Sequence, residues 1–184
     1  AAILMAAVSL PAQNKSAGIN ISIWKDICTQ PHDSTQTTYV NIGLLSTMNR
    51  LNGVGINALG SVVHGDMNGV QITGLANLAG GTMRGVQLAG ISNISGNNTV
   101  GLSAAGLVNI TVVGEHMNGL QMAGIANITA SKLNGVQIAL CNYATQARGL
   151  QIGLVNYYKE DMKGFQLGLV NANPDTRVQM MVYG

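Results

Sequence analysis

Few side chains in this 184-residue chain are suited to acid–base or metal chemistry, and they are scattered. His64 and His116 lie in similar stretches, HGDMNG and EHMNG. Imidazole is the commonest metal ligand and titrates near neutral pH, so these two positions are the first to test for catalysis. His32 and Asp33 form the other polar pair, and no nucleophile signature stands beside them.

The two histidines belong to different copies of an internal repeat, three units apart. If the copies stack as strands, this separation is about 14 Å, because neighbouring strands lie about 4.8 Å apart. Zinc ligands must each lie about 2 Å from one shared metal. The carboxylates of Asp66, Glu160 and Asp161 also fall in turn-like stretches. We therefore expect exposed loop histidines, no catalytic residue, no metal site and no cofactor.

The repeat organises the chain from Tyr39 onward, and such a period decides the fold. The stretch GLQMAGIANI (119–128) has near copies in GVQITGLANL (69–78) and GVQLAGISNI (85–94). Units of 14 to 18 residues begin at a recurring glycine: Gly53, Gly69, Gly85, Gly101, Gly119, Gly135, Gly149 and Gly164. Beyond Arg50 the charged residues fall between the motifs, which predicts strands within each motif and exposed turns between them.

Within a unit, apolar and polar residues alternate, as Val70, Gln71 and Ile72 do. Period two indicates a short strand with one buried face, and we expect the Val, Ile and Leu positions to fill the core. The intervening glutamines then form an exposed face, a possible recognition surface for glycan or protein: Gln71, Gln87, Gln121, Gln137, Gln151 and Gln166. The methionines before the glycines, such as Met67 and Met83, are expected to be core filler.

Asparagine recurs at a fixed offset after the corner of seven units: Asn77, Asn93, Asn109, Asn127, Asn142, Asn156 and Asn171. In stacked parallel coils identical residues lie directly above one another, so this column predicts a ladder of hydrogen-bonded side-chain amides. Glycines such as Gly74 and Gly90 leave the apolar pattern in phase, which indicates a corner between two short strands. The sequence thus favours an all-β fold, a repetitive parallel β-solenoid.

An up-and-down outer-membrane β-barrel is the alternative, with a pore or anchoring role, because a ten-residue motif is long enough to cross a bilayer when tilted. Three features favour the solenoid. Every unit ends in the same Met/Leu-x-Gly phrase, whereas a barrel alternates short and long connections. Aromatic residues, which form girdles on barrels, are only 4% of the chain. A hydrogen-bonded ladder explains why asparagine recurs at one position of the repeat, whereas a lipid-crossing strand offers no reason for it.

The phrases GLQIGLVN (149–156) and GFQLGLVN (164–171) resemble the exported surface-repeat proteins of bacteria, which carry tandem GxQxGLxN units and occur in Bacteroidota and spirochaetes. The resemblance covers residues 39–184 and implies an envelope or surface location in a Gram-negative-type bacterium, with no catalytic residues to carry over. In organisation alone, the repeats are similar to the β-roll heads of trimeric autotransporter adhesins.

The remaining segments suggest export. Residues 1–13, an apolar run followed by small residues, have the character of a partial signal peptide. Residues 14–38 do not repeat, and they are expected to form a cap for the open end of the solenoid, with 39–184 as the tandem β repeats. Cys28 and Cys141 are expected to be small buried hydrophobes.

Composition limits the partners. Charged residues are 9% of the chain and the net charge is +2, so the basic patch of a nucleic-acid binder is missing. We expect a non-enzymatic surface or periplasmic protein with a structural or adhesive role, whose partners are its own copies, a surface protein or glycan, or the outer membrane. A carbohydrate-binding module using the glutamine face is a third reading.

Overall fold

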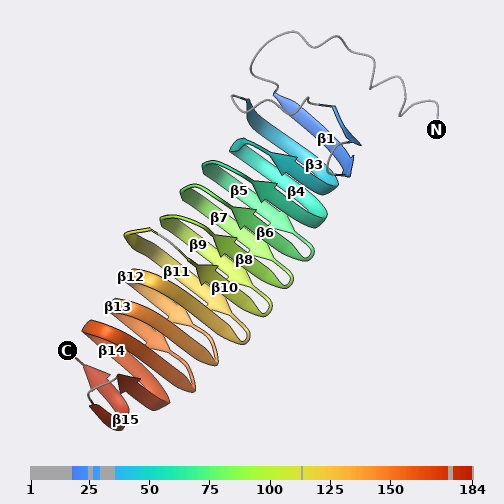
Figure 1. The fold of residues 1–184 in the computed structure, drawn as a ribbon. Helices are drawn as coiled ribbons and strands as arrows, with labels where there is room; N and C mark the ends of the chain where they lie inside the picture. Colours follow the sequence, from blue (N-terminus) through green and yellow to red (C-terminus); the bar gives the residue numbers. More distant parts are fainter. Residues whose placement is uncertain (1–17, 25–26, 30–35, 113, 174–175, 184) are drawn as a thin grey trace.

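The computed structural model describes residues 18–24, 27–29, 36–112, 114–173 and 176–183. They form a stack of about eight flattened β coils (Figure 1). The coils follow one another in chain order, from the blue end at β1 to the red end at β15. Coils pair in parallel with the coils before and after them. The predicted parallel β-solenoid is therefore confirmed, and the alternative of a barrel is wrong.

The described residues form fifteen strands. In the middle coils a longer strand is followed by a separate shorter one, whereas β12, β13 and β14 each run without a break from the layer of shorter strands into the layer of longer strands. The first part of the chain contains β1 (Ile19–Trp24), β2 (Ile27–Cys28), β3 (Thr37–Met48), β4 (Arg50–Val63), β5 (Met67–Thr73), β6 (Ala76–Ala79), β7 (Met83–Ala89) and β8 (Ser92–Ser95). The second part contains β9 (Thr99–Ala105), β10 (Val108–Thr111), β11 (His116–Ala123), β12 (Ala126–Ile138), β13 (Cys141–Ile152), β14 (Val155–Asn173) and β15 (Thr176–Tyr183).

Two layers of parallel strands face each other across the core. The longer strands β5, β7, β9 and β11 stack in one layer, and the shorter strands β6, β8 and β10 stack in the other. Register follows the repeat: the recurring glycines pair with one another, and so do the recurring asparagines. The predicted corner lies between the layers, where Gly74 and Leu75 turn the chain from β5 into β6.

The recurring glycine is a requirement of the stack. Gly119 has a backbone φ of 135°, a region that side chains rarely adopt. A Cβ placed there would lie 2.0 Å from the carbonyl oxygen of Gly101 in the preceding coil. Only glycine lets the backbones approach at this point, which explains why the repeat can be recognised by its glycine column.

The ends of the stack differ from the repeat. At the N-terminal end β1 pairs in parallel with β3, and β2 pairs antiparallel with β1. At the C-terminal end β15 pairs antiparallel with β14, so the last strand is not another coil. This corrects the expectation that repeats continue to residue 184. The predicted signal segment, residues 1–13, lies outside the described residues, and no helix long and apolar enough to cross a membrane occurs among those described.

The core is polar, contrary to the sequence expectation. Among the described residues, twenty-eight buried side chains are polar and only twelve are apolar. The methionine column is core filler as predicted, since Met67 and Met83 are fully buried. The expectation that Val, Ile and Leu fill the core is wrong: Ile72 is 36% exposed and Val70 only half-buried. Because Met67 and Gln71 share one face of the strand, Val70 and Ile72 must point outward.

Candidate functional site

The residues suited to catalysis do not converge. His64 lies in the turn after β4, and His116 begins β11 and stands in register with Lys132. No group of three His, Cys, Asp or Glu side chains that could hold a metal ion occurs in the part of the chain that the structure describes. His32 and Asp33 lie outside the described residues. Cys141 is exposed on the outer face, which corrects the expectation that it is buried.

The asparagine column forms the hydrogen-bonded ladder that its spacing predicts. From Asn77 to Asn171 each side-chain Nδ2 donates to the Oδ1 of the next asparagine, at 2.8 to 3.0 Å. The second N–H of each amide has a different role. Asn127 Nδ2 also donates to the carbonyl oxygen of Ile138, 3.0 Å away in the next coil, just before the chain turns. An asparagine therefore links adjacent coils and also satisfies a corner carbonyl.

The glutamine column is buried, so the predicted exposed glutamine face is wrong. Every member is at most 1% exposed: Gln71, Gln87, Gln121, Gln137, Gln151 and Gln166. The side chains form their own ladder, in which Nε2 of one glutamine donates to Oε1 of the preceding one, at 2.7 to 3.0 Å. Ser103 interrupts this ladder in the middle coil. Burial of these amides is tolerated because each hydrogen bond within the ladder takes the place of a hydrogen bond to water that is lost on burial.

Hydroxyl groups from the opposite layer join the glutamine ladder. Thr129 Oγ1 donates to Gln121 Oε1 at 3.0 Å, and Gln137 Nε2 donates to Thr129 Oγ1 at 3.1 Å. Ser95 makes the corresponding contact with Gln87 at 3.3 Å. The two ladders and these hydroxyls tie the layers together by directional bonds, and they leave the apolar side chains of the repeat to face outward.

The outer surface is apolar on three sides. On the layer of longer strands it presents positions such as Val70 and Ile72, and on the shorter strands positions such as Leu78, 40% exposed. Between them runs what we call the corner edge, eight large apolar residues that are 41% to 65% exposed: Leu59, Leu75, Ile91, Leu107, Ile125, Leu140, Leu154 and Leu169. Contiguous apolar surface of this kind marks an interaction site in a folded protein.

The fourth side carries the charge. We call it the charged edge: the side of the stack on which each coil passes from the layer of shorter strands to the layer of longer strands, through a connecting loop in the middle coils and within the strand itself in β12, β13 and β14. It holds every charged side chain that the structure describes: Arg50, Asp66, Arg84, Glu115, Lys132, Arg148, Lys159, Glu160, Asp161 and Lys163. The solenoid is therefore amphipathic in cross-section, with the charged edge opposite the corner edge.

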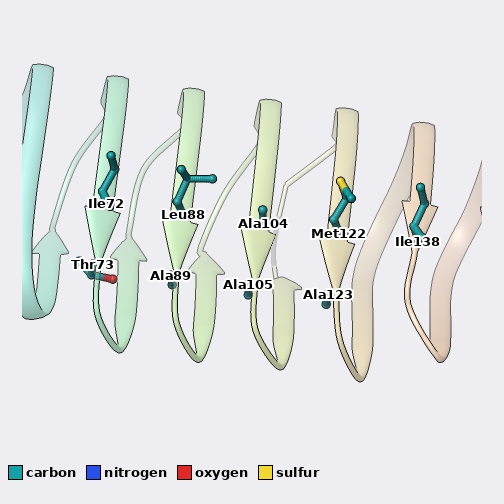
Figure 2. A pocket seen from close by; sticks show the side chains of 9 residues that line it. All are labelled: Ile72, Thr73, Leu88, Ala89, Ala104, Ala105, Met122, Ala123 and Ile138. Carbon is teal, nitrogen blue, oxygen red and sulfur yellow. The ribbon is translucent and has the colours of Figure 1, made fainter.

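A shallow apolar groove of about 480 Å³ lies on the outer face of the longer strands (Figure 2). Its small side chains at one register position are Ala89, Ala105 and Ala123. Ala104 stands between the longer side chains of Leu88 and Met122, as Figure 2 shows, and so lowers the surface at β9. The groove is a dip in the apolar face, lined without a charged group, and it offers shape rather than reactive chemistry.

The sequence contained a signal that two of the expectations about the core conflict. Met67 and Gln71 are four residues apart in one strand, so they share a face, whereas Val70 lies on the other. Burial of the methionines and burial of the valines were therefore incompatible expectations. Comparison with known proteins finds no matching family model, no similar curated protein and no similar solved structure.

Proposed function

We propose that this chain is a non-enzymatic structural or adhesive repeat protein that acts by association through its apolar outer surface. The observation that supports this proposal most directly is that apolar side chains lie on the outside of the solenoid and polar side chains on the inside. Twenty-eight large hydrophobic residues are exposed among the described residues, while the interior is held by amide ladders. Exposure of this apolar surface to water is unfavourable, because apolar groups are stabilised when they are removed from water. Association that covers the surface is therefore favourable.

Stiffness supports a structural role. Parallel strands with in-register side-chain ladders resist bending and slippage, as stacked amides do in fibrous β assemblies. Eight coils at about 4.8 Å each give a rod roughly 38 Å long. Such a rod presents the same apolar surface at each coil, which suits repeated contact along its length. An exported, envelope location remains part of the proposal, supported by the character of residues 1–13 and by the repeat motif.

Association can be measured on the purified full chain. We expect the protein to bind an apolar dye such as ANS while folded, and to sediment as an assembly in buffer without detergent. The variant Leu107→Glu places a charge on the corner edge, and it should reduce both properties. Asn97→Glu, which adds the same charge on the opposite edge of a neighbouring coil, is the matched control and should change neither. A monodisperse monomer that binds no dye would contradict the proposal.

The non-enzymatic part of the proposal has a separate test. His64→Ala combined with His116→Ala should leave dye binding and sedimentation unchanged, because both residues lie on the charged edge, away from the apolar surface. Loss of any catalytic activity in this double variant would overturn the assignment.

A further inference from the structure

We propose that the surface which covers this solenoid is a lipid leaflet. The rod lies with its axis in the plane of the membrane, the corner edge inserted among the acyl chains and the charged edge at the headgroups. This inference rests on the proposed function, since it names the partner of the same apolar surface. Three independent features of the structure carry it: the shape of the apolar surface, its depth, and the pairing of the backbone at the corner.

The apolar surface is continuous around an edge. The outer positions of the longer strands, the corner edge and the outer positions of the shorter strands follow one another around each coil, as Ile72, Leu75 and Leu78 do. A second copy packed face to face would cover one layer and leave the corner edge and the other layer in water. A fluid hydrocarbon covers all three sides at once. The shape therefore favours lipid over a flat protein partner.

The apolar surface is shallow enough to lie within one leaflet. From Val70 to Thr73, where β5 ends, the strand advances about 10 Å at roughly 3.3 Å per residue, and the turn at Gly74 and Leu75 extends the surface to less than the fully extended limit of about 17 Å. Half of a hydrocarbon core of about 30 Å is about 15 Å. Asn68, two residues before Val70, would then lie at the level of the headgroups. The polar-to-apolar gradient across the coil therefore fits within one leaflet.

Backbone groups at the corner are already paired, as hydrocarbon demands. Gly74 donates its N–H to the carbonyl oxygen of Asn57 at 3.1 Å, and Leu75 donates to Leu59 at 2.9 Å. The carbonyl oxygen of Leu88, which precedes the next corner, accepts from Asn77 Nδ2 at 2.9 Å.

The charged side chains lie on the edge that the proposed orientation places at the lipid headgroups. The charged edge has six Lys or Arg and four Asp or Glu residues among those described, a net charge of +2. This excess is too small to hold the rod on an anionic surface alone, so insertion of the corner edge must supply the binding. Tyr143 and Tyr157 stack with ring centroids 5.6 Å apart on the shorter-strand face, and tyrosine is enriched where a membrane meets water.

Flotation of the full chain with phosphatidylcholine vesicles, with and without phosphatidylglycerol, tests this assignment. We expect binding to both kinds of vesicle. The double variant Leu107→Glu/Ile125→Glu should lower the partition coefficient by about a hundredfold or more, since each charge must enter hydrocarbon. The control Asn97→Glu/Ala130→Glu adds the same two charges on the charged edge and should bind as the unmodified chain does. Circular dichroism should show the same β signal for all three proteins.

Depth can be read from a dye on Cys141, which is exposed beside the corner residue Leu140. With Cys28→Ser, an NBD label at Cys141 should shift to the blue on vesicles. The same label on Ala130→Cys, in a Cys141→Ala background, should not shift. A blue shift only at position 130, or binding that requires phosphatidylglycerol and ignores the corner-edge charges, would overturn the inference in favour of adsorption through the charged edge.

Different experimental outcomes would overturn the lipid inference and the proposed function. If vesicles are not bound, yet the chain self-associates and Leu107→Glu disperses it, the lipid inference is overturned and the proposed function stands. If the chain binds neither vesicles, its own copies nor an apolar dye, both are overturned.

Discussion

The inverted core predicts that removing a polar side chain costs more stability than removing the apolar side chain next to it. Asn127 and Ile128 are neighbours in β12 and point to opposite faces of the layer. Asn127 is fully buried, whereas Ile128 is 36% exposed. Replacing each by alanine is therefore a matched pair at one place in the fold. In a conventional solenoid with an apolar core the isoleucine substitution would be the more damaging.

The cost of Asn127→Ala follows from the bonds that are lost. The amide donates to Asn142 Oδ1 and to the carbonyl oxygen of Ile138, both at 3.0 Å, and accepts from Asn109 at 2.9 Å. A longer contact of 3.3 Å joins the same Nδ2 to the carbonyl oxygen of Gln121. Removal deprives the two closer acceptors of their donor. A buried polar group left without a partner costs about 1–3 kcal/mol, so the two together give roughly 4 kcal/mol.

The cost of Ile128→Ala is smaller because the side chain is partly in water. Fully burying an isoleucine is worth about 1.5–3 kcal/mol. Two-thirds burial, against its in-register neighbours Ile110 and Tyr143, leaves roughly 1–2 kcal/mol. The expected difference between the variants is therefore about 2 kcal/mol, in favour of the asparagine as the more important residue.

Thermal and urea unfolding of the two variants, followed by far-ultraviolet circular dichroism, measures this difference. For a chain of this length about 1 kcal/mol shifts the midpoint by roughly 2–4 °C, so the asparagine variant should melt some 4–8 °C below the isoleucine variant. Both variants are compared with the unmodified chain under the same conditions, because repeat proteins can unfold in segments. A larger loss for Ile128→Ala would refute the polar-core reasoning.

Two further predictions concern the stack itself. Asn77 Oδ1, at the start of the asparagine ladder, has no hydrogen-bond partner among the described residues, and Ser61 stands in register before it. The variant Ser61→Asn should add one hydrogen bond to the ladder, stabilise the fold by about 1 kcal/mol and raise the thermal midpoint. An unchanged or lower midpoint would count against the ladder as a stabilising element. Gly119→Ala should prevent or severely weaken folding, by on the order of 3 kcal/mol or more, because its Cβ would meet a backbone oxygen at 2.0 Å. Gly18→Ala, where a Cβ would meet nothing within 4 Å, is the control for that variant and should fold normally in the same unfolding assay.

Local periodicity determined the strands, the corners and the parallel stacking. Identical residues at 14 to 18-residue intervals lie directly above one another when each unit is one coil, so the asparagine ladder and the glycine column could be predicted once the solenoid was preferred to the barrel. The end of the repeat could not. Residues 176–183 reverse direction to pair antiparallel with β14, a long-range pairing for which the repeat pattern gives no signal.

The choice of buried face was decided by the tertiary structure. Alternation in a strand defines two faces but does not say which is inside, and the usual preference for burying Val and Ile pointed to the wrong one. Gln71 is an acceptable core residue only when another glutamine lies in register in the next coil, and its partner Gln87 is sixteen residues away. The sequence by itself therefore determined the coil and its period. Only the stacking of coils, which satisfies each buried amide through its neighbour, determined that the polar face lies inside and the apolar face outside.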